Sequence, residues 1–320
     1  MQSAMSDLPK FVTIQEEGPR EGFQIEKVPI ATSDKVRFIE ALAETGLKKI
    51  DCVSYVNPVR VPGMADADEV ARAIRKREGV AYTGLWLNKK GFERALTLPL
   101  TMIGSVMVAA SETFSRKNIG KSIEESYIEQ AATMALYLQH RVEIRWGIVF
   151  TAFGCNYEGD VPLATVLDRC TRLIELAREQ GVTLKGLYLA DTVGWANPNS
   201  VQRCVGAVRE RWPEMRIGLH LHDTRGTGLP NAFAALQMGV DQFDSSCAGL
   251  GGCPFAAHKG AAGNICTEDF VFMCHEMGIE TGIDLDRLID CALMAEQIVG
   301  HPLPGKVMKG GSLSRYRQPH

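Results

Sequence analysis

Short apolar segments recur eight times along this chain, and turn residues followed by a helix-like pattern separate them. A strand followed by a helix is the repeating unit of a parallel sheet whose connections pack on its outside. Eight such units within about 250 residues fit a closed (β/α)8 barrel, the TIM barrel, better than an open, doubly wound sheet. The predicted strands are 11–14, 49–55, 81–87, 102–110, 142–150, 184–190, 217–222 and 242–247.

Amphipathic segments with helical spacing lie between these strands, and two more follow the last one. The alternative, a dinucleotide-binding sheet, requires GxGxxG after the first strand, where this chain reads EEGPREGFQ. We therefore expect a catalytic barrel over residues 8–255 and a C-terminal helical cap over residues 256–320 that completes the same domain. The predicted helices are 33–45 (with Ser33 as candidate N-cap), 67–76, 123–139, 163–179, 199–212, 267–277 and 284–298.

Composition excludes several classes of protein. The 35 basic and 38 acidic residues give a net charge of −3 with no basic block, which argues against a nucleic-acid partner. Nine cysteines without CxxC spacing argue against a zinc ribbon, a thioredoxin motif and a disulfide framework, and favour reduced thiols. The start of the chain does not resemble a signal peptide, and no apolar run approaches the roughly 18 residues of a membrane span. We expect a cytoplasmic protein with no membrane partner.

Reactive side chains gather where the predicted strands end. A (β/α)8 barrel carries its active site at the carboxyl ends of its strands, so residues that are distant in sequence meet at one rim. The sequence therefore predicts one site. Its candidates are Arg20 and Glu21 after the first strand, Asp51 in the second, Asp191 after the sixth, His220 and His222 at the end of the seventh, and Cys253 after the eighth.

The motif GLHLHD points to a metal. His220 and His222 are two residues apart on a strand, so both side chains face the same side. They offer two ligands to a metal, although two hydrogen-bonded histidines would give the same pattern. The remaining candidate ligands, Glu21 and Asn264, supply oxygen atoms. Two nitrogens with oxygen donors favour Mg²⁺ or Mn²⁺ over a structural zinc ion.

Three further positions each allow two interpretations. Glu21 and Arg20 are either a solvated pair or a cation ligand beside a guanidinium that holds a substrate oxygen. Asp191 is either a helix N-cap or a group that contacts metal or substrate. Cys253, on the Gly-rich turn GLGGCPFA, is either core filler or a catalytic acid or base, because backbone N–H groups there favour a thiolate.

The chain resembles the 3-hydroxy-3-methylglutaryl-CoA (HMG-CoA) lyase family from about residue 11 to residue 300. The resemblance rests on several long strings: GPREGFQIEK, IDCVSYVNP, VAASETFSRKNIGKSIEES, GCNYEG, LADTVG, HLHDTRGTGLPNAFAALQMGVDQFDSSCAGLGGCPFA and GNICTEDFVFM. Homocitrate and isopropylmalate synthases share the Arg-acid turn and the paired histidines but not the GLGGCP loop.

This resemblance implies a metal-dependent carbon–carbon lyase. It implies retro-Claisen cleavage of an acyl-CoA substrate, HMG-CoA, to acetyl-CoA and acetoacetate, and a homodimer with its contact around residues 284–298. It implies that Mg²⁺ or Mn²⁺ is bound by Glu21, His220, His222 and Asn264. It also implies that Arg20 stabilises the enolate, that Cys253 donates a proton and that Asp191 lies near the substrate hydroxyl. Glu16 and Asp51 are implied as further acidic site residues, and Lys27 as a coenzyme A contact.

Some positions depart from the family pattern. Glu21 replaces the usual aspartate and Asp51 the usual glutamate, and we hypothesise that the two acids compensate in length. Arg225 stands where an uncharged aromatic residue is expected, and could read an additional carboxylate. The loop from Cys253 to Asn264 is also longer. These changes leave open a lyase for another tertiary 3-hydroxyacyl-CoA, such as citramalyl-CoA. A condensing synthase and a non-enzymatic barrel that binds acyl-CoA or metal are the remaining alternatives.

Overall fold

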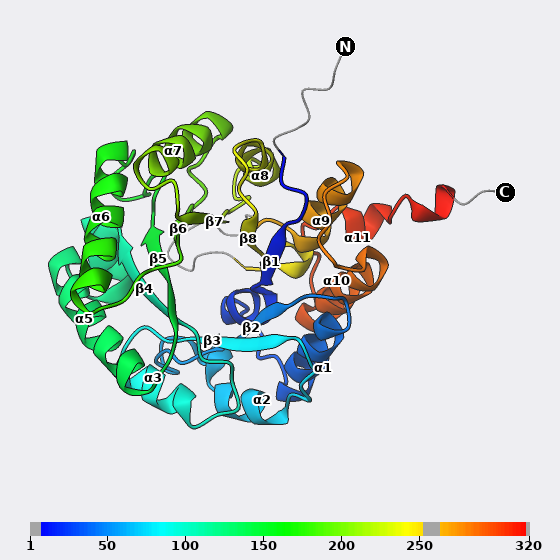
Figure 1. The fold of residues 1–320 in the computed structure, drawn as a ribbon. Coiled ribbons are helices and arrows are strands. Elements are labelled where there is room, and N and C mark those ends of the chain that lie inside the picture. Colours follow the sequence, from blue (N-terminus) through cyan, green and yellow to red (C-terminus); the bar gives the residue numbers. More distant parts are fainter. Residues whose placement is uncertain (1–7, 252–262, 318–320) are drawn as a thin grey trace, which may run out of the picture.

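The computed structural model describes residues 8–251 and 263–317, except for the side chain of Arg315. Eight parallel strands curl into a barrel with helices around its outside, which confirms the predicted TIM-barrel fold (Figure 1). Each predicted strand is present with slightly shifted ends. The strands are β1 (Thr13–Glu16), β2 (Lys49–Ser54), β3 (Ala81–Leu85), β4 (Gly104–Ala109), β5 (Ile144–Phe150), β6 (Gly186–Ala190), β7 (Arg216–His220) and β8 (Gln242–Ser245).

The hydrogen-bonded order of the strands is β3-β2-β1-β8-β7-β6-β5-β4. The pairing of β1 with β8 joins the first and last units, as a barrel requires. Within the described ranges, β3 and β4 stand at the two ends of this order. Thr101, just before β4, donates a backbone hydrogen bond of 2.7 Å to the carbonyl of Tyr82 in β3.

The helices follow the strands as predicted, with four additions, two of which are only three and four residues long. The two longer additions are α3, which follows β3, and α8, which follows β7. Helix α8 opens with glycine and proline, which weakens its helical signature, whereas α3 is amphipathic, has Asn88 as its N-cap and was missed at a length of only eight residues. The helices are α1 (Thr32–Ala43), α2 (Ala67–Ala73), α3 (Lys89–Leu96), α4 (Glu112–Phe114), α5 (Ile123–Gln139), α6 (Leu163–Glu179), α7 (Pro198–Arg211), α8 (Gly228–Gln237), α9 (Thr267–Glu276), α10 (Leu285–Val299) and α11 (Val307–Gly310), with short turns η1 (Gly18–Gly22), η2 (Pro62–Met64), η3 (Ser115–Ile119), η4 (Cys247–Gly249) and η6 (Ser314–Tyr316).

The start of α1 differs from the prediction. Ser33 lies inside the helix, and the N-cap is Ala31, which makes no side-chain cap. The backbone explains the shift, because Ala31 is already extended and its carbonyl accepts hydrogen bonds from Asp34 and Lys35. No helix in the described part of the chain is long and apolar enough to cross a membrane.

The main core lies between the barrel and its helices. Along the segment that contains β1, Val12 and Ile14 are buried on the helix side, whereas Gln15 and Glu17 line the inside of the barrel. This alternation decides which polar residues can reach a ligand. Beyond β8, α9 and α10 pack on each other, and α10 also packs against α1 (Figure 1).

Candidate active site

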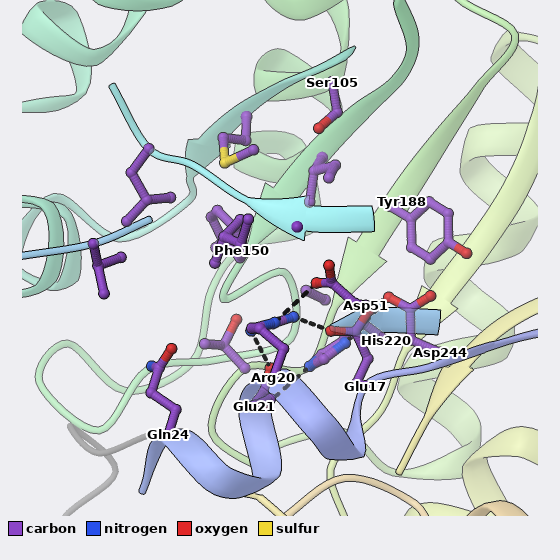
Figure 2. A pocket seen from close by; sticks show the side chains of 18 of the residues that line it. Glu17, Arg20, Glu21, Gln24, Asp51, Ser105, Phe150, Tyr188, His220 and Asp244 are labelled. Carbon is purple, nitrogen blue, oxygen red and sulfur yellow. Dashed lines mark hydrogen bonds and ion pairs between the residues drawn. The ribbon is translucent and has the colours of Figure 1, made fainter. Parts of the chain in front are cut away.

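A cavity of about 710 Å³ occupies the barrel and extends into the loops that follow the strands. One wall is apolar, with Leu85, Met107 and Phe150 among its residues. The opposite wall is dense with charge (Figure 2). Its charged and imidazole side chains are Glu17, Arg20, Glu21, Asp51, His220, His222 and Asp244.

The two histidines and Glu21 form a compact group of possible metal ligands. The Nε2 atoms of His220 and His222 lie 3.1 Å apart. Oε1 of Glu21 is 3.3 Å from Nε2 of His222 and 3.8 Å from Nε2 of His220. One ligand atom from each residue lies within 4.8 Å of the other two. Two imidazole nitrogens and a carboxylate oxygen at this spacing can hold a divalent cation.

Asn264 adds a fourth side chain to this group. Its Nδ2 donates a hydrogen bond of 3.1 Å to Glu21 Oε1, and its backbone pairs with that of His222. The side chain is buried, and within the described residues its Oδ1 has no hydrogen-bond partner. A buried acceptor without a donor is rare in proteins, and a bound cation would satisfy it. The residues present therefore fit a cation held by nitrogen and oxygen donors.

Arg20 lies in the turn η1 directly after β1 and contacts three carboxylates. Its Nε donates to Asp51 Oδ2 at 2.9 Å, its Nη1 to Glu21 Oε2 at 2.9 Å, and its Nη2 to Glu17. With Asp244 beside His220, this group holds four carboxylates against one permanent cation. Excess negative charge in a buried site attracts a divalent cation.

Burial and charge shift the proton affinities of the group. Burial raises the pKa of Glu17 to about 8, although the Arg20 guanidinium acts in the opposite direction. Burial also favours the neutral form of Glu21, but His220 and Arg20 hold the pKa of Glu21 well below its usual range. For His220, burial lowers the pKa, while the carboxylates of Glu21 and Asp244 raise it to about 9. A proton on His220 therefore competes with a cation for Glu21.

Two acidic residues of this group, Glu17 and Asp244, were not among the predicted site residues. Asp244 Oδ2 lies 3.2 Å from His220 Nδ1, the arrangement by which a carboxylate orients a metal-binding imidazole. Strand alternation is the signal for both. In β8, Phe243 is buried outside the barrel, whereas Asp244 lines the cavity.

Glu16, a predicted site residue, does not line the cavity. Its Oε1 accepts hydrogen bonds from the backbone N–H groups of Gly18 and Cys247, each at 2.8 Å, and its Oε2 accepts one of 2.7 Å from Thr267 Oγ1. Burial raises the pKa of Glu16 to about 7. The carboxyl group thus ties the turn after β1 to the segments after β8, on the side of the strand that faces the helices.

Asp191 lies beside the charged wall without lining the cavity. Its Oδ1 accepts hydrogen bonds from the backbone of Trp195 (2.7 Å) and Ala196 (3.1 Å), which holds the β6–α7 turn together. Its Oδ2 is buried and has no hydrogen-bond partner in the described part of the chain. Burial raises the pKa of Asp191, while the charge of His222 opposes that shift. The N-cap of α7 is Asn197, so Asp191 does not cap that helix.

Three other positions complete the comparison with the prediction. Cys253 lies outside the described residues. Lys27 is exposed and does not line the cavity. Arg225 donates hydrogen bonds to the carbonyls of Val193 (3.1 Å) and Gly194 (2.8 Å) and also lies outside the cavity lining, so it holds a loop in this structure.

Comparison with known proteins decides the family. A model of the HMGL-like family matches residues 12–294. The hydroxymethylglutaryl-CoA lyase YngG of Bacillus subtilis is 43% identical over 300 residues, which cover 93% of this chain and 96% of that protein. The chain belongs to the HMG-CoA lyase family. It is an enzyme, a lyase of the HMG-CoA lyase type.

Other relatives in the HMG-CoA lyase family agree in sequence and in structure. The crystal structure of the B. subtilis HMG-CoA lyase has a TM-score of 0.88 at 40% identity and covers 95% of this chain and 98% of that one. An HMG-CoA lyase from Acinetobacter baumannii, in complex with coenzyme A and 3-methylmalate, has a TM-score of 0.86 at 35% identity, with 100% of both chains covered. A 3-hydroxy-3-isohexenylglutaryl-CoA/hydroxymethylglutaryl-CoA lyase from Pseudomonas aeruginosa is 40% identical over 295 residues, covering 92% of this chain and 95% of that protein.

Proposed function

We propose that this enzyme is a divalent-cation-dependent lyase that cleaves HMG-CoA to acetyl-CoA and acetoacetate. The observation that carries the proposal is the group of Glu21, His220 and His222 beside Arg20 in one cavity. The identity of about 40% to enzymes named HMG-CoA lyase supports the choice of substrate.

Glu21, His220, His222 and Asn264 would hold the cation. Two imidazole nitrogens with carboxylate and amide oxygens suit Mg²⁺ or Mn²⁺. When bound, a divalent cation lowers the pKa of a coordinated hydroxyl group and polarises a coordinated oxygen. Asp244 orients His220 from behind through the 3.2 Å contact with its Nδ1.

In the proposed reaction, the substrate's 3-hydroxyl group loses its proton and the bond between C2 and C3 breaks. The electron pair moves into the thioester as an enolate, and a ketone forms at C3. Arg20, whose position Asp51 and Glu17 fix, stabilises the developing enolate oxygen. Glu17, which lines the cavity and accepts a hydrogen bond from Arg20, is the proposed acceptor of the hydroxyl proton.

A proton must then reach the acetyl carbanion. Cys253 is the proposed donor, and a proton returned from Glu17 restores its thiol, so the cycle consumes no net proton. Asp191 would keep the β6–α7 turn in place beside His222. Glu16 would position the turn that carries Arg20 and Glu21, because it accepts a hydrogen bond from Gly18 in that turn.

The proposed coenzyme A end of the substrate lies at the mouth of the cavity. Asn57 and Arg60 follow β2, Lys121 follows β4, and all three line the cavity and offer polar contacts. The coenzyme A complex of the A. baumannii relative supports an acyl-CoA ligand. Lys27 is exposed, lies three residues after the lining residue Gln24, and would contact coenzyme A from the surface.

We also propose that residues 8–255 and 256–320 act as one catalytic domain. The backbone of Ser246 pairs with that of Cys266, and Asn264 contacts Glu21 in the ligand group. A C-terminal region that supplies a candidate ligand cannot be a separate functional unit.

A second candidate is a lyase for a different tertiary 3-hydroxyacyl-CoA, such as citramalyl-CoA or a longer branched ester. Two observations favour it: the cavity continues into the barrel beneath Arg20, and one relative is named for an isohexenyl substrate. Acetyl-CoA release from a panel of CoA esters, with Mg²⁺ or Mn²⁺, tests both. We expect cleavage of HMG-CoA that stops with EDTA; cleavage of another ester alone would favour the second candidate, and no acetyl-CoA from any ester would refute both.

A further inference from the structure

Tyr188 lies in the inner wall of the barrel, below the group of candidate metal ligands. It belongs to β6, lines the cavity and is 5% exposed. In the sheet it pairs with Gly218 of β7, and Gly218 pairs in turn with Gln242 of β8. His220 stands two residues beyond Gly218 towards the rim and pairs with Asp244. Tyr188 therefore lies one inward-facing level beneath His220.

Gly218 leaves the space that the Tyr188 ring occupies. A Cβ on Gly218 would lie 2.5 Å from both Cε2 and Cζ of that ring, far inside contact distance. On β5, the opposite neighbour of β6, Trp146 makes an edge contact with the ring, and the two ring centroids lie 4.9 Å apart. Because the ring is confined from both sides, its hydroxyl is carried across β7 towards β8 in a fixed direction.

The hydroxyl of Tyr188 joins two side chains of β8. It donates a hydrogen bond to the carboxylate of Asp244 and accepts one from the amide of Gln242. The direction of both bonds follows from the chemistry of the partners, since an ionised carboxylate can only accept and a primary amide can donate. Because Gln242 donates to the tyrosine oxygen, the hydroxyl proton stays directed at Asp244.

Asp244 passes this constraint on to a candidate metal ligand. Its Oδ2 lies 3.2 Å from Nδ1 of His220, and Nε2 of the same ring belongs to the ligand group with Glu21 and His222. In Figure 2, Tyr188, Asp244 and His220 lie along the same side of the cavity. A carboxylate orients an imidazole well only when the carboxylate is itself held, and the tyrosine hydroxyl supplies that hold from below.

We propose that Tyr188 is a positioning residue for the cation site and acts on His220 through Asp244. The chain of contacts starts at Gln242 and ends at the imidazole, so loss of the tyrosine hydroxyl loosens a ligand that the tyrosine never touches. This inference rests on the proposed function of a divalent-cation-dependent lyase. It adds a residue of β6 to a site whose ligands come from other parts of the chain.

Calorimetric titration of Mn²⁺ into EDTA-treated enzyme tests the role of Tyr188. The variant Tyr188→Phe removes one oxygen atom and keeps the ring, so it breaks the contact with Asp244 and preserves the packing. We expect its affinity for Mn²⁺ to fall about 3- to 10-fold, a smaller loss than for a group that contacts the ligand directly. Tyr137→Phe is the matched control and should keep full affinity. Tyr137 is also buried, and its hydroxyl accepts a hydrogen bond of 2.6 Å from Trp86, but it does not line the cavity.

A double variant separates positioning from general destabilisation. Asp244→Ala removes the carboxylate through which Tyr188 acts. In that background Tyr188→Phe should cause no further loss of Mn²⁺ affinity, because the two residues belong to one chain of contacts. Independent effects would instead multiply.

Each outcome has one meaning. Full Mn²⁺ affinity in Tyr188→Phe, an equal loss in Tyr137→Phe, or multiplied losses in the double variant would overturn the inference. Absence of Mn²⁺ binding to the wild-type enzyme would instead refute the proposed cation-dependent function. If Tyr188→Phe does not fold, Gln242→Met decides, since it removes the donor that directs the tyrosine proton. Its affinity should fall about 3-fold, and full affinity would overturn the inference.

Discussion

Replacing Glu16 with glutamine keeps the shape of a buried side chain and removes its titration. The side chain is fully buried, and burial raises its pKa from 4.5 to about 7. Glutamine can make the same contacts. Its oxygen can accept the hydrogen bonds from Gly18 and Cys247, and its amide can donate to Thr267 Oγ1, which in the wild type donates to Glu16 Oε2.

The sign and size of the effect follow from the two pKa values. The folded state holds the proton more tightly than the unfolded state, so this group's stabilising contribution is complete below pH 4.5. As the pH rises towards 7, the unfolded state releases the proton first, and the free energy of unfolding falls. A shift from 4.5 to about 7 corresponds to a loss of about 3 kcal/mol over that window. Glu16→Gln lacks this loss.

Urea unfolding between pH 4.5 and 8, followed by tryptophan fluorescence in EDTA, measures the effect. The free energy of unfolding of Glu16→Gln minus that of the wild type should rise by about 3 kcal/mol from the low to the high end of this range. Glu175→Gln, at an exposed position, is the control and should show no such rise. A pH-independent difference for Glu16→Gln would refute the reasoning.

Four other substitutions have defined outcomes. Glu268→Gln should reproduce the pH effect, since Glu268 is also buried with a pKa of about 7; a flat difference in urea unfolding would contradict this. Asp244→Asn should weaken Mn²⁺ affinity about 10- to 100-fold in calorimetry, and unchanged affinity would exclude its role behind His220. Glu21→Asp should lower the rate of acetyl-CoA release, because a shorter side chain cannot reach both His222 and Arg20, and an unchanged or faster rate would disprove this. Arg20→Met should lower kcat about 100- to 1,000-fold, and a loss confined to KM would argue against enolate stabilisation.

The barrel could be predicted because its strands and most of its helices carry strong periodic patterns. The bounds predicted for α5 and α6, 123–139 and 163–179, match the structure. Helix α8 was missed because it opens with Gly228 and Pro230 in its first turn, which are poor helix signals outside a fold.

The site was predictable in outline, since the rim of a barrel collects strand ends. The alternation of side chains along β1 also distinguishes Glu16 from Glu17. Val12 and Ile14 are apolar and face the helices, so Glu16 faces the helices as well, and Glu17 faces the inside of the barrel. The three carboxylate contacts of Arg20 come from different elements, and no local pattern specifies which acids it meets.

Calorimetric titration of Mn²⁺ into EDTA-treated enzyme tests the central claim most directly, namely that side chains from different strands hold one divalent cation. We expect binding of a single ion, with affinity reduced about 10-fold or more in His222→Ala and in Asn264→Ala, and unchanged in His275→Ala, whose histidine lies outside the cavity. Absence of binding to the wild-type protein, or full affinity in both His222→Ala and Asn264→Ala, would contradict the account.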